Sequence, residues 1–416
     1  MNLLYAQSGG VTAVINASAA GVLQAARAQP ARIGTVFAAR RGILGAIAED
    51  LVDTTALDAD ELQRLAHTPG GAFGSSRFDL PDEADDPRLY DRLFDVFSAH
   101  GIGGVLYNGG NGSMDLVVRL SGAARRRGYP LVCVGVPKTV DNDIVGTDCC
   151  PGFGSAAKYL ATSMREAGLD IAAMATPKGS VFIMEVMGRN TGWLAASTAL
   201  AAAGDADAPP HLVLLPEVAF DEERFLERVQ AVVRRLGHCA ITVAEGLRHA
   251  DGSLIMEKSH DARGYVQLGG AGMAIAQLIQ ARLGYKYHLA VPDYLQRAAG
   301  HCLSATDHAQ AMALGRAAVD CLLDGRDQSM PAIRRLSDRP YVWDVVPVPV
   351  APIANLERQL PPEFIAGDGF HVSAAACRYL QPLIEGQVAV PMVAGLPDFR
   401  PFHLPQVPAC LPAWTD

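Results

Sequence analysis

The sequence predicts an α/β protein with two doubly wound domains built on mostly parallel sheets, plus a C-terminal extension. Short apolar runs alternate with Ala-rich helical stretches through the first half of the chain. Glycine-bearing turns follow several of these runs, and 416 residues exceed what one hydrophobic core usually serves. This strand–helix–strand rhythm is typical of parallel sheets that are covered by helices on both faces.

The expected elements follow one another in the order that this fold class requires. We expect strands at residues 2–6, 33–38, 103–107 and 130–136, with helices at 12–28 and 91–100. A helix over 152–168 opens a second set, which continues with strands near 181–185, 212–215 and 240–243. From about Pro340 the chain becomes rich in proline, which favours extended segments and edge strands.

We therefore divide the chain into three parts. Residues 1–152 with 296–340 form the first domain, residues 153–295 the second, and residues 341–416 the extension. Ligands of doubly wound proteins bind at the carboxyl ends of the strands, so functional side chains are expected directly after strands.

Composition and charge exclude several functional classes. No run approaches about 18 apolar residues, and the first residues lack the regions of a signal peptide, so we expect no membrane span. The eight cysteines lack metal-ligand spacing and are expected as reduced thiols in a cytoplasmic protein. A net charge of −9 argues against nucleic acid as the main partner, so positive charge for an anionic ligand must gather locally.

Three turns follow predicted strands: QSGG at 7–10, NGGNGS at 108–113 and PKTVDNDI at 137–144. Glycine lets the backbone approach phosphate oxygens, and amides at the start of a following helix direct positive dipole toward them. Neither the Walker A pattern nor the G-x-G-x-x-G fingerprint is present, which disfavours P-loop and dinucleotide-binding proteins. Together the three turns predict a phosphate-binding crevice at the ends of neighbouring strands.

The segment PKTVDNDI carries the most chemistry. Its carboxylates, Asp141 and Asp143, could deprotonate a hydroxyl and hold a metal ion. The ammonium of Lys138 could neutralise phosphate oxygens, and Thr139 adds a hydroxyl. An Asx-type turn is the alternative explanation of the DND triplet taken alone.

Four further pieces carry polar groups that suit a phosphosugar. They are, in chain order, Arg77 in the loop GGAFGSSRF, Met187-Gly188-Arg189 after a strand, Glu245 after another strand, and Tyr294 with Arg297 in YLQR. Each has a structural alternative, because exposed arginines are often merely solvated, a methionine can belong to the core, and a glutamate before glycine can hold a turn. Their significance depends on their occurring together.

These motifs make the chain resemble one family. SGG with Asn16, GGxFGSSR, GGNGS, PKTVDNDI, EVMGRNTGW, AEG and YLQR occur in the order of the phosphofructokinase family over about residues 3–320. The chain looks most similar to the bacterial pyrophosphate-dependent 6-phosphofructokinases. The resemblance implies that one domain binds the phosphoryl donor and the other mainly fructose 6-phosphate. It also implies phosphoryl transfer to the sugar's 1-hydroxyl, Mg²⁺ as cofactor, and a homodimer or homotetramer.

The resemblance assigns roles residue by residue. Asp141 resembles the general base, Thr139 the hydroxyl that contacts the transferred phosphoryl group, and Arg189 and Lys138 the cations that neutralise charge during transfer. Positions for the donor are matched by Gly10, Arg77, Asn111, Gly112 and Ser113, and metal positions by Asn111 and Asp143. Positions for the sugar phosphate are matched by Thr139, Asp141, Met187, Gly188, Arg189, Glu245, Tyr294 and Arg297.

Two positions that distinguish donors in this family disagree here. Pyrophosphate users generally have Asp at the position of Gly112, where its carboxylate takes the place of the nucleotide's α-phosphate, whereas ATP users have Gly. Pyrophosphate users also have the lysine found here as Lys138, which many bacterial ATP users replace with Gly, although some ATP-using branches combine Gly with Lys. We expect pyrophosphate as the donor, with ATP as the alternative.

Two further departures affect the metal and the acceptor. Asn111 stands where many members have a magnesium-binding Asp, and an amide oxygen is a weaker magnesium ligand than a carboxylate. Ser180 stands where a neighbouring subunit usually donates an arginine to the sugar 6-phosphate. Lys178, Lys286 and His288 are candidates to replace that arginine.

These departures leave other functions open. The acceptor could be a different sugar phosphate, such as a seven-carbon one, or the chain could be a paralogue that binds metabolites without turnover. The presence of Asp141, Thr139 and Arg189 argues against a silent paralogue, because such a protein needs no positioned base. A kinase of the NAD or lipid type with a GGDGT turn is disfavoured by Asn111 and by the length of the PKTVDNDI match.

Overall fold

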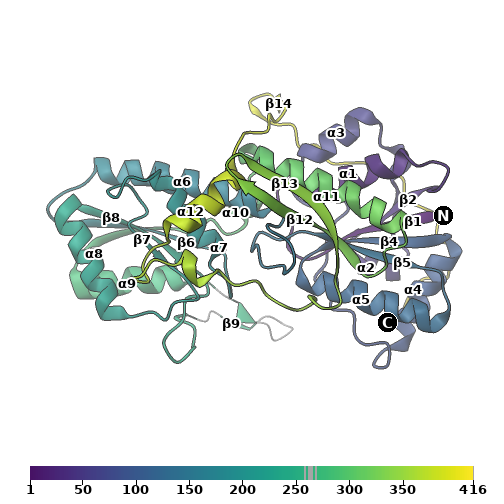
Figure 1. Cartoon of the computed structure of the whole chain (residues 1–416), viewed down its shortest axis with the longest axis horizontal. Coiled ribbons are helices and arrows are strands. Elements are labelled where there is room, and N and C mark those ends of the chain that lie inside the picture. Colours follow the sequence, from purple (N-terminus) through teal and green to yellow (C-terminus); the bar gives the residue numbers. More distant parts are fainter. Residues whose placement is uncertain (257–258, 261–265, 268, 416) are drawn as a thin grey trace. The chain divides into compact units, whose positions relative to one another are not determined.

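The protein forms two compact units in a computed structural model that describes residues 1–256, 259–260, 266–267 and 269–415. Unit 1 comprises Met1–Ser155, Ala298–Glu357 and Gly386–Asp416, and unit 2 comprises Ala156–Arg297 and Arg358–Glu385 (Figure 1). Each unit is an α/β structure with its own sheet, as the strand–helix rhythm of the sequence predicts. Within the described ranges, no helix combines the length and apolar character that a membrane crossing demands.

Unit 1 is built on a seven-stranded sheet in the order β13-β12-β5-β4-β1-β2-β3. Its central strands are parallel, and only the two outer strands run antiparallel to their neighbours. The strands are β1 (Asn2–Gln7), β2 (Val36–Ala39), β3 (Leu51–Asp53), β4 (Ile102–Gly109), β5 (Val132–Pro137), β12 (Ser329–Asp338) and β13 (Tyr341–Pro349). The central strands read as apolar runs because helices bury both faces of the sheet.

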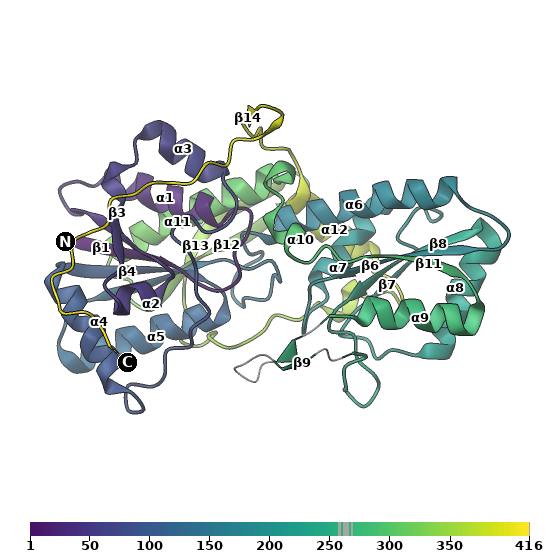
Figure 2. The same ribbon diagram turned by 180° about the vertical axis from the view of Figure 1, so that it is seen from behind.

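The helices of unit 1 cover the two faces of this sheet. Figures 1 and 2 show α1 (Ile15–Arg27), α3 (Ala59–His67) and α11 (Ala305–Leu323) on one face. The other face carries α2 (Ile43–Ile47), α4 (Pro87–Ala99) and α5 (Asn111–Arg127). Each face has its own apolar core.

Close contact between α1 and α11 depends on two glycines. A Cβ atom at Gly21 would lie 2.3 Å from the carbonyl oxygen of Met312, and one at Gly315 would lie 2.1 Å from that of Ser18. Both distances are far below van der Waals contact, so any side chain at either position would push the helices apart.

Unit 2 is built on a smaller, fully parallel sheet in the order β11-β6-β8-β7. Its strands are β6 (Ser180–Val186), β7 (Leu212–Leu214), β8 (His238–Ala244) and β11 (Lys286–Ala290). Its long helices are α6 (Phe153–Ala173), most of which belongs to this unit, α8 (Glu222–Leu236) and α9 (Ala271–Leu283). The apolar faces of α8 and α9 pack on the strands.

Short elements complete the chain. The short helices are α7 (Trp193–Ser197), α10 (Tyr294–Ala298) and α12 (Ala374–Leu380), with 3₁₀ turns η1 (Thr54–Ala56), η2 (Thr198–Ala202), η3 (Gly300–Cys302), η4 (Pro362–Phe364) and η5 (Gln381–Ile384). Two small antiparallel strand pairs are formed by β9 (Ser259–His260) with β10 (Val266–Gln267) and by β14 (Met392–Val393) with β15 (Leu396–Pro397).

The structure distributes the proline-rich segment 341–416 over both units. β13 pairs with β12 at the edge of the sheet of unit 1. Residues 358–385 belong to unit 2, where the indole of Trp193 donates to the carbonyl oxygen of Arg358 at 3.0 Å. The rings of Phe364 and Tyr379 lie 6.0 Å and 5.5 Å from that of Trp193. The segment therefore contributes to both cores.

The last residues return to unit 1 and cover an edge of its sheet. Val407 donates its backbone N–H to the carbonyl oxygen of Leu51 at 2.9 Å, and Gln406 forms a bridge with Val52. Figure 2 shows this tail in yellow, running past β3. The backbone groups of an exposed edge strand invite pairing with other chains, so the tail protects this edge.

Glu49 anchors the end of the tail. Its buried carboxylate accepts the backbone N–H groups of Cys410 at 2.6 Å and of Leu411 at 3.2 Å. A His100 ring nitrogen lies 2.7 Å from the carboxylate oxygen that accepts the Cys410 N–H, and the Arg92 guanidinium lies 3.4 Å from the oxygen that accepts the Leu411 N–H. Burial acts to raise the pKa of Glu49, but the two N–H groups and His100 outweigh burial and lower that pKa.

We expect Glu49→Gln to lower the free energy of unfolding by about 1–3 kcal/mol and to expose the tail to carboxypeptidase, because it leaves buried partners poorly paired. Since the pKa of Glu49 is lowered in the folded protein, its contribution is present above the ordinary value of 4.5 and is lost as the pH falls through the lowered value. Denaturant unfolding at several pH values measures the loss of stability and its pH dependence, and carboxypeptidase digestion measures the exposure of the tail.

Asp95→Asn is the matched control, because Asp95 is exposed on α4. Equal stability and equal protease resistance of the Glu49→Gln and Asp95→Asn variants would show that Glu49 does not hold the tail.

Candidate active site

The three turns singled out in the sequence meet in unit 1. The chain passes from β1 outward to β2 on one side and returns to β4 on the other, so the carboxyl ends of β1 and β4 flank the point where the strand order reverses. Ser8 donates its N–H to the carbonyl oxygen of Asn108 at 2.8 Å, and Lys138 donates its N–H to that of Gly109 at 3.0 Å. The turns after β1, β4 and β5 are thus directly bonded to one another.

Lys138 ties two of these turns together. Its ammonium donates to the carbonyl oxygens of Ser8 and Gly10, each at 2.7 Å, and its side chain is buried. Gly9, with a φ of 76°, lies between these carbonyls, and a Cβ there would lie 3.3 Å from the ammonium nitrogen. The turn therefore requires glycine and carries a fixed positive charge against its backbone.

The loop that contains Arg77 packs on the same turn. Gly9 donates its N–H to the carbonyl oxygen of Ser76 at 2.9 Å, and the Ser75 hydroxyl donates to that of Gly9 at 2.7 Å. The loop is thus held against the QSGG turn, and Arg77 is exposed directly after it.

The NGGNGS turn opens helix α5. Gly110 is the N-cap without a side-chain cap, Asn111 is the first helical residue, and Ser113 is buried while Gly112 is exposed. A helix of 17 residues has a substantial positive dipole at this end, so its first amides favour an anion.

Asn111 lies next to Asp143. Its amide nitrogen donates to a carboxylate oxygen of Asp143 at 3.0 Å. Its amide oxygen is buried and has no hydrogen-bond partner among the residues that the structure describes. A buried acceptor without a partner is costly unless a bound group pairs with it.

The DND loop is shaped by its neighbours. The Thr139 hydroxyl accepts the N–H of Asp141 at 3.1 Å, and Asn142, with a φ of 55°, accepts the N–H of Cys150 through its side chain at 2.9 Å. Asn142 is buried, whereas Asp141 and Asp143 are partly exposed. The turn itself therefore uses the threonine and the asparagine, and both carboxylates stand at the strand end.

Unit 2 gathers a second group at the carboxyl ends of β6 and β8. Gly188 donates its N–H to the Glu245 carboxylate at 3.4 Å, and Gly246 donates to the carbonyl oxygen of Gly188 at 3.1 Å. A Cβ at Gly246 would lie 1.9 Å from the carbonyl oxygen of Arg189, so this close approach requires glycine. Met187 is partly buried and Arg189 is exposed beside it.

Burial raises the pKa of Glu245 above its ordinary value of 4.5. The negative charges of Glu185 and Asp293 act in the same direction, whereas the Gly188 N–H and the charge of Arg189 act against it. A carboxyl group poised in this way suits hydrogen bonding to neutral hydroxyls.

Tyr294 and Arg297 stand together on α10. The Arg297 guanidinium lies 4.0 Å from the centre of the Tyr294 ring, and Tyr294 is 64% exposed. Gln296, which lies between them in sequence, is buried and accepts the N–H of Met187 at 3.2 Å. Gln296 also donates to the carbonyl oxygen of Asp293 at 3.0 Å. This glutamine, which the sequence reasoning missed as a functional residue, connects the YLQR and MGR segments.

Glu185 is a second residue that the sequence reasoning did not assign. Its buried carboxylate accepts the N–H groups of Gly270 and Gly272, each at 2.8 Å, and thereby caps the start of α9. The protein's own carboxylate thus holds that helix end. The only sequence signal for this contact was the EVMGR motif that contains Glu185.

The candidate replacements for the missing arginine lie elsewhere in unit 2. Ser180 begins β6 and pairs with Lys286 of β11, and His288 is two residues further along β11. His288 lies in the middle of β11. Ser180 and Lys286 lie at the amino ends of their strands, and Ser180 is about 20 Å of extended chain from Met187. Lys178 precedes the same strand end and is exposed. None of them joins the group at the carboxyl ends within the same unit, so a contribution to another subunit stays a prediction.

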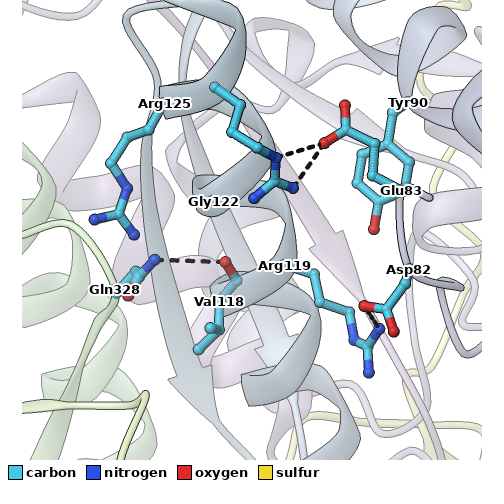
Figure 3. Close-up of a pocket in the computed structure, with 9 residues that line it drawn as sticks. Asp82, Glu83, Tyr90, Val118, Arg119, Gly122, Arg125 and Gln328 are labelled. Carbon is cyan, nitrogen blue, oxygen red and sulfur yellow. Dashed lines mark hydrogen bonds and ion pairs between the residues drawn. The ribbon is translucent and has the colours of Figure 1, made fainter.

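A surface pocket of about 270 Å³ on unit 1 is a different feature (Figure 3). It is lined by Asp82, Glu83, Tyr90, Val118, Arg119, Gly122, Arg125, Arg126 and Gln328, which include none of the predicted site residues. Arg119 pairs with Asp82, and Arg126 with Glu83, so most of its positive charge is already neutralised.

A cluster of Glu49, His100 and Cys410 is the one group of possible metal ligands found among the described residues. Its carboxylate already accepts bonds from the tail and lies next to Arg92, which disfavours a cation. All eight cysteines are free thiols in the structure. The catalytic candidates are therefore the two groups at the strand ends.

Comparison with known proteins identifies the relatives of this chain. The phosphofructokinase family model matches residues 2–322. Pyrophosphate–fructose 6-phosphate 1-phosphotransferase of Methylococcus capsulatus is 51% identical over 399 residues, which are 96% of this chain and 95% of that protein. The enzyme of the same name from Xanthomonas campestris is 49% identical over 416 residues, with 99% of each chain covered.

A solved structure has the same fold along the whole chain. The crystal structure of pyrophosphate-dependent phosphofructokinase from Marinobacter aquaeolei is 46% identical, covers 100% of this chain and 99% of its own, and superposes with a TM-score of 0.90. These relatives confirm the predicted fold class of two doubly wound α/β units. The chain belongs to the phosphofructokinase family.

Proposed function

We propose that this protein transfers a phosphoryl group from pyrophosphate to the 1-hydroxyl of fructose 6-phosphate, giving fructose 1,6-bisphosphate and phosphate. The observation that carries the proposal is the bonding of Lys138 to the QSGG turn, which gathers glycine-rich phosphate turns and a DND carboxylate pair at one strand edge. Two relatives named for that activity are 51% and 49% identical to this chain over nearly its full length, which supports these substrates.

Unit 1 supplies the donor group in this proposal. The backbone around Gly10, the amide of Gly112 at the start of α5, and the charges of Lys138 and Arg77 would bind pyrophosphate oxygens. The Ser113 N–H donates to the carbonyl oxygen of Gly110 at 3.0 Å, so Ser113 would contribute through its hydroxyl. Fixed N–H groups and cations need no rearrangement as charge moves between oxygens during transfer.

Unit 2 supplies the acceptor group. Glu245 would accept hydrogen bonds from sugar hydroxyls, and Arg297, held over Tyr294, would neutralise the sugar's own phosphate. Met187 and Gly188 would form the backbone wall of this subsite, because Gln296 and Glu245 fix their N–H groups.

The chemical step needs a base and charge stabilisation. Asp141 takes the proton of the 1-hydroxyl, whose oxygen then bonds to the transferred phosphorus as the bond to the leaving phosphate breaks. Thr139 contacts the transferred group, while Arg189 and Lys138 stabilise its charge. The phosphoanhydride bond of pyrophosphate and the phosphate ester of the product differ little in their free energy of hydrolysis. The reaction should therefore run in both directions and serve glycolysis as well as the reverse flux.

Asn111 and Asp143 fit a magnesium ion. The buried amide oxygen of Asn111 lacks a partner among the described residues, while the amide nitrogen of the same side chain donates to the carboxylate of Asp143 at 3.0 Å. Oxygen ligands of this kind suit Mg²⁺, which in proteins keeps several waters and substrate oxygens as its other ligands. Mg²⁺ would neutralise donor oxygens there. A homo-oligomeric assembly and a cytoplasmic location stay predictions.

The donor is tested by steady-state kinetics with fructose 6-phosphate and Mg²⁺. We expect kcat/KM with pyrophosphate to exceed that with ATP by about a hundredfold or more. A preference for ATP would contradict the donor while leaving the family reaction in place. Activity with neither donor would contradict the proposed function altogether.

Asp141→Ser should lower kcat by a factor on the order of 10² to 10⁴, because it removes the base. The binding constant for fructose 6-phosphate, measured by calorimetry, should change much less than kcat. Asp95→Asn, an exposed change on α4, serves as the control for the loss of one charge. A kcat near the wild-type value in the Asp141→Ser variant would eliminate this residue as the base.

The affinity for fructose 6-phosphate should depend on the ionisation of Glu245. The ionised carboxylate is the form that accepts hydrogen bonds, and its pKa is raised, so affinity should begin to fall at a higher pH than for an ordinary glutamate. Calorimetric titrations between about pH 8 and pH 5 measure this fall. Glu245→Gln removes the titrating group and leaves only the pH dependence of the sugar's phosphate, so identical profiles would refute the assignment.

A further inference from the structure

The exposed residue Gly112 has an acidic neighbour that comes from a different part of unit 1. Gly112 is exposed at the second position of α5. A Cβ atom built on it would meet one heavy atom within 4 Å, a carboxylate oxygen of Asp79 at 3.8 Å. The amides that favour an anion and the carboxylate that repels one therefore lie side by side at the same helix end.

Two ion pairs fix the segment that carries Asp79 along α5. Arg119 pairs with Asp82 and Arg126 pairs with Glu83 at 2.6 Å, and both arginines share a helical stripe with Gly112. Figure 3 shows the contact between Arg119 and Asp82 beside the helix. Residues 79–83 thus run along one face of α5, with Asp79 at the end nearest the donor turns.

The start of the same segment is held by the QSGG turn and the core. Ser76 bridges to Ser8, and Phe78 and Leu80 pack in the core beneath. Arg77 and Asp79 alternate with them and are exposed. Side chains two residues apart in an extended segment share a face, so Asp79 is presented on the same side as Arg77.

Under the proposed function, this arrangement would separate donors by their number of phosphates. Two phosphates would satisfy the cations and amides around Gly10, Lys138 and the start of α5. A third phosphate that continued across Gly112 would bring its negative charge to the carboxylate of Asp79. Like charges brought together in a ligand site weaken binding, so a donor with a third phosphate would be disfavoured relative to pyrophosphate.

We infer that Asp79 is the residue that restricts the donor to pyrophosphate, an inference that rests on the proposed function. The carboxylate that selects against a third phosphate comes from the loop after Arg77, and Gly112 leaves room for it. Asp79 acts on specificity alone and takes no part in the bond changes at the transferred phosphorus.

The test compares pyrophosphate, inorganic tripolyphosphate and ATP as donors, each with Mg²⁺ and fructose 6-phosphate. Tripolyphosphate carries the third phosphate without a nucleoside, so it isolates charge from size. In Asp79→Asn we expect the kcat/KM ratios of tripolyphosphate and ATP to pyrophosphate to rise about tenfold or more. Asp85→Asn, an exposed carboxylate in the same loop, should leave both ratios unchanged.

A second variant keeps the inference falsifiable. Adding Gly112→Asp to Asp79→Asn returns a carboxylate to the same space, so both ratios should fall back toward wild type. A rise for tripolyphosphate alone still supports the role of charge, because the nucleoside then meets a separate obstacle. Unchanged ratios in Asp79→Asn would overturn the inference.

The wild-type protein distinguishes this inference from the proposed function. Wild-type protein that uses ATP as readily as pyrophosphate would overturn the role of Asp79 while leaving the phosphotransferase intact. Wild-type protein inactive with all three donors would remove the proposed function itself, and the inference with it.

Discussion

The buried ammonium of Lys138 is the interaction on which the phosphate-binding end of unit 1 depends. It comes from the end of β5 and donates to two carbonyl oxygens of the turn after β1, although β4 lies between these two strands in the sheet. A buried cation is costly unless its hydrogen-bonding groups are satisfied, so the QSGG turn must present its carbonyls inward. The N–H groups of Ser8 and Gly9 donate to neighbouring turns, so the backbone N–H of Gly10 and the start of α5 are the groups left to face a ligand. The Lys138 side chain thus determines which backbone groups of this turn can face a ligand.

Much of this arrangement could be predicted from sequence because it follows from strand order. Apolar runs followed by glycine turns locate the carboxyl ends of parallel strands, and these ends must share one edge. That reasoning places the turns at 7–10, 108–113 and 137–144 together, and the structure bonds them to one another. It also locates Met187 and Glu245 at a common edge in unit 2. Expected boundaries were less accurate: β2 begins at Val36, where residue 33 was expected, because residues 29–33 form a turn.

What the sequence could not show are contacts between positions that no local pattern connects. Gln296 reads as an ordinary polar residue of a short helix, yet it is buried and holds the backbone of Met187. Glu185 reads as the end of a strand, yet it caps a helix that starts 86 residues later, at Ala271. The proline-rich end of the chain reads as an appendage, yet it supplies an edge strand and closes around Trp193. Each depends on tertiary packing, which composition and periodicity do not encode.

The two positions that distinguish phosphoryl donors show why single residues of a motif can point to different donors. Gly112 taken alone indicates an open site, and Lys138 taken alone indicates pyrophosphate. A ligand, however, responds to charge at a point in space and not to the position in sequence that provides it. Because residues 79–83 run along the same helical stripe as Gly112, a carboxylate from the loop reaches the space that a side chain at 112 would enter. The glycine and the loop carboxylate then form one unit of recognition, and substitution of either has to be judged together with the other.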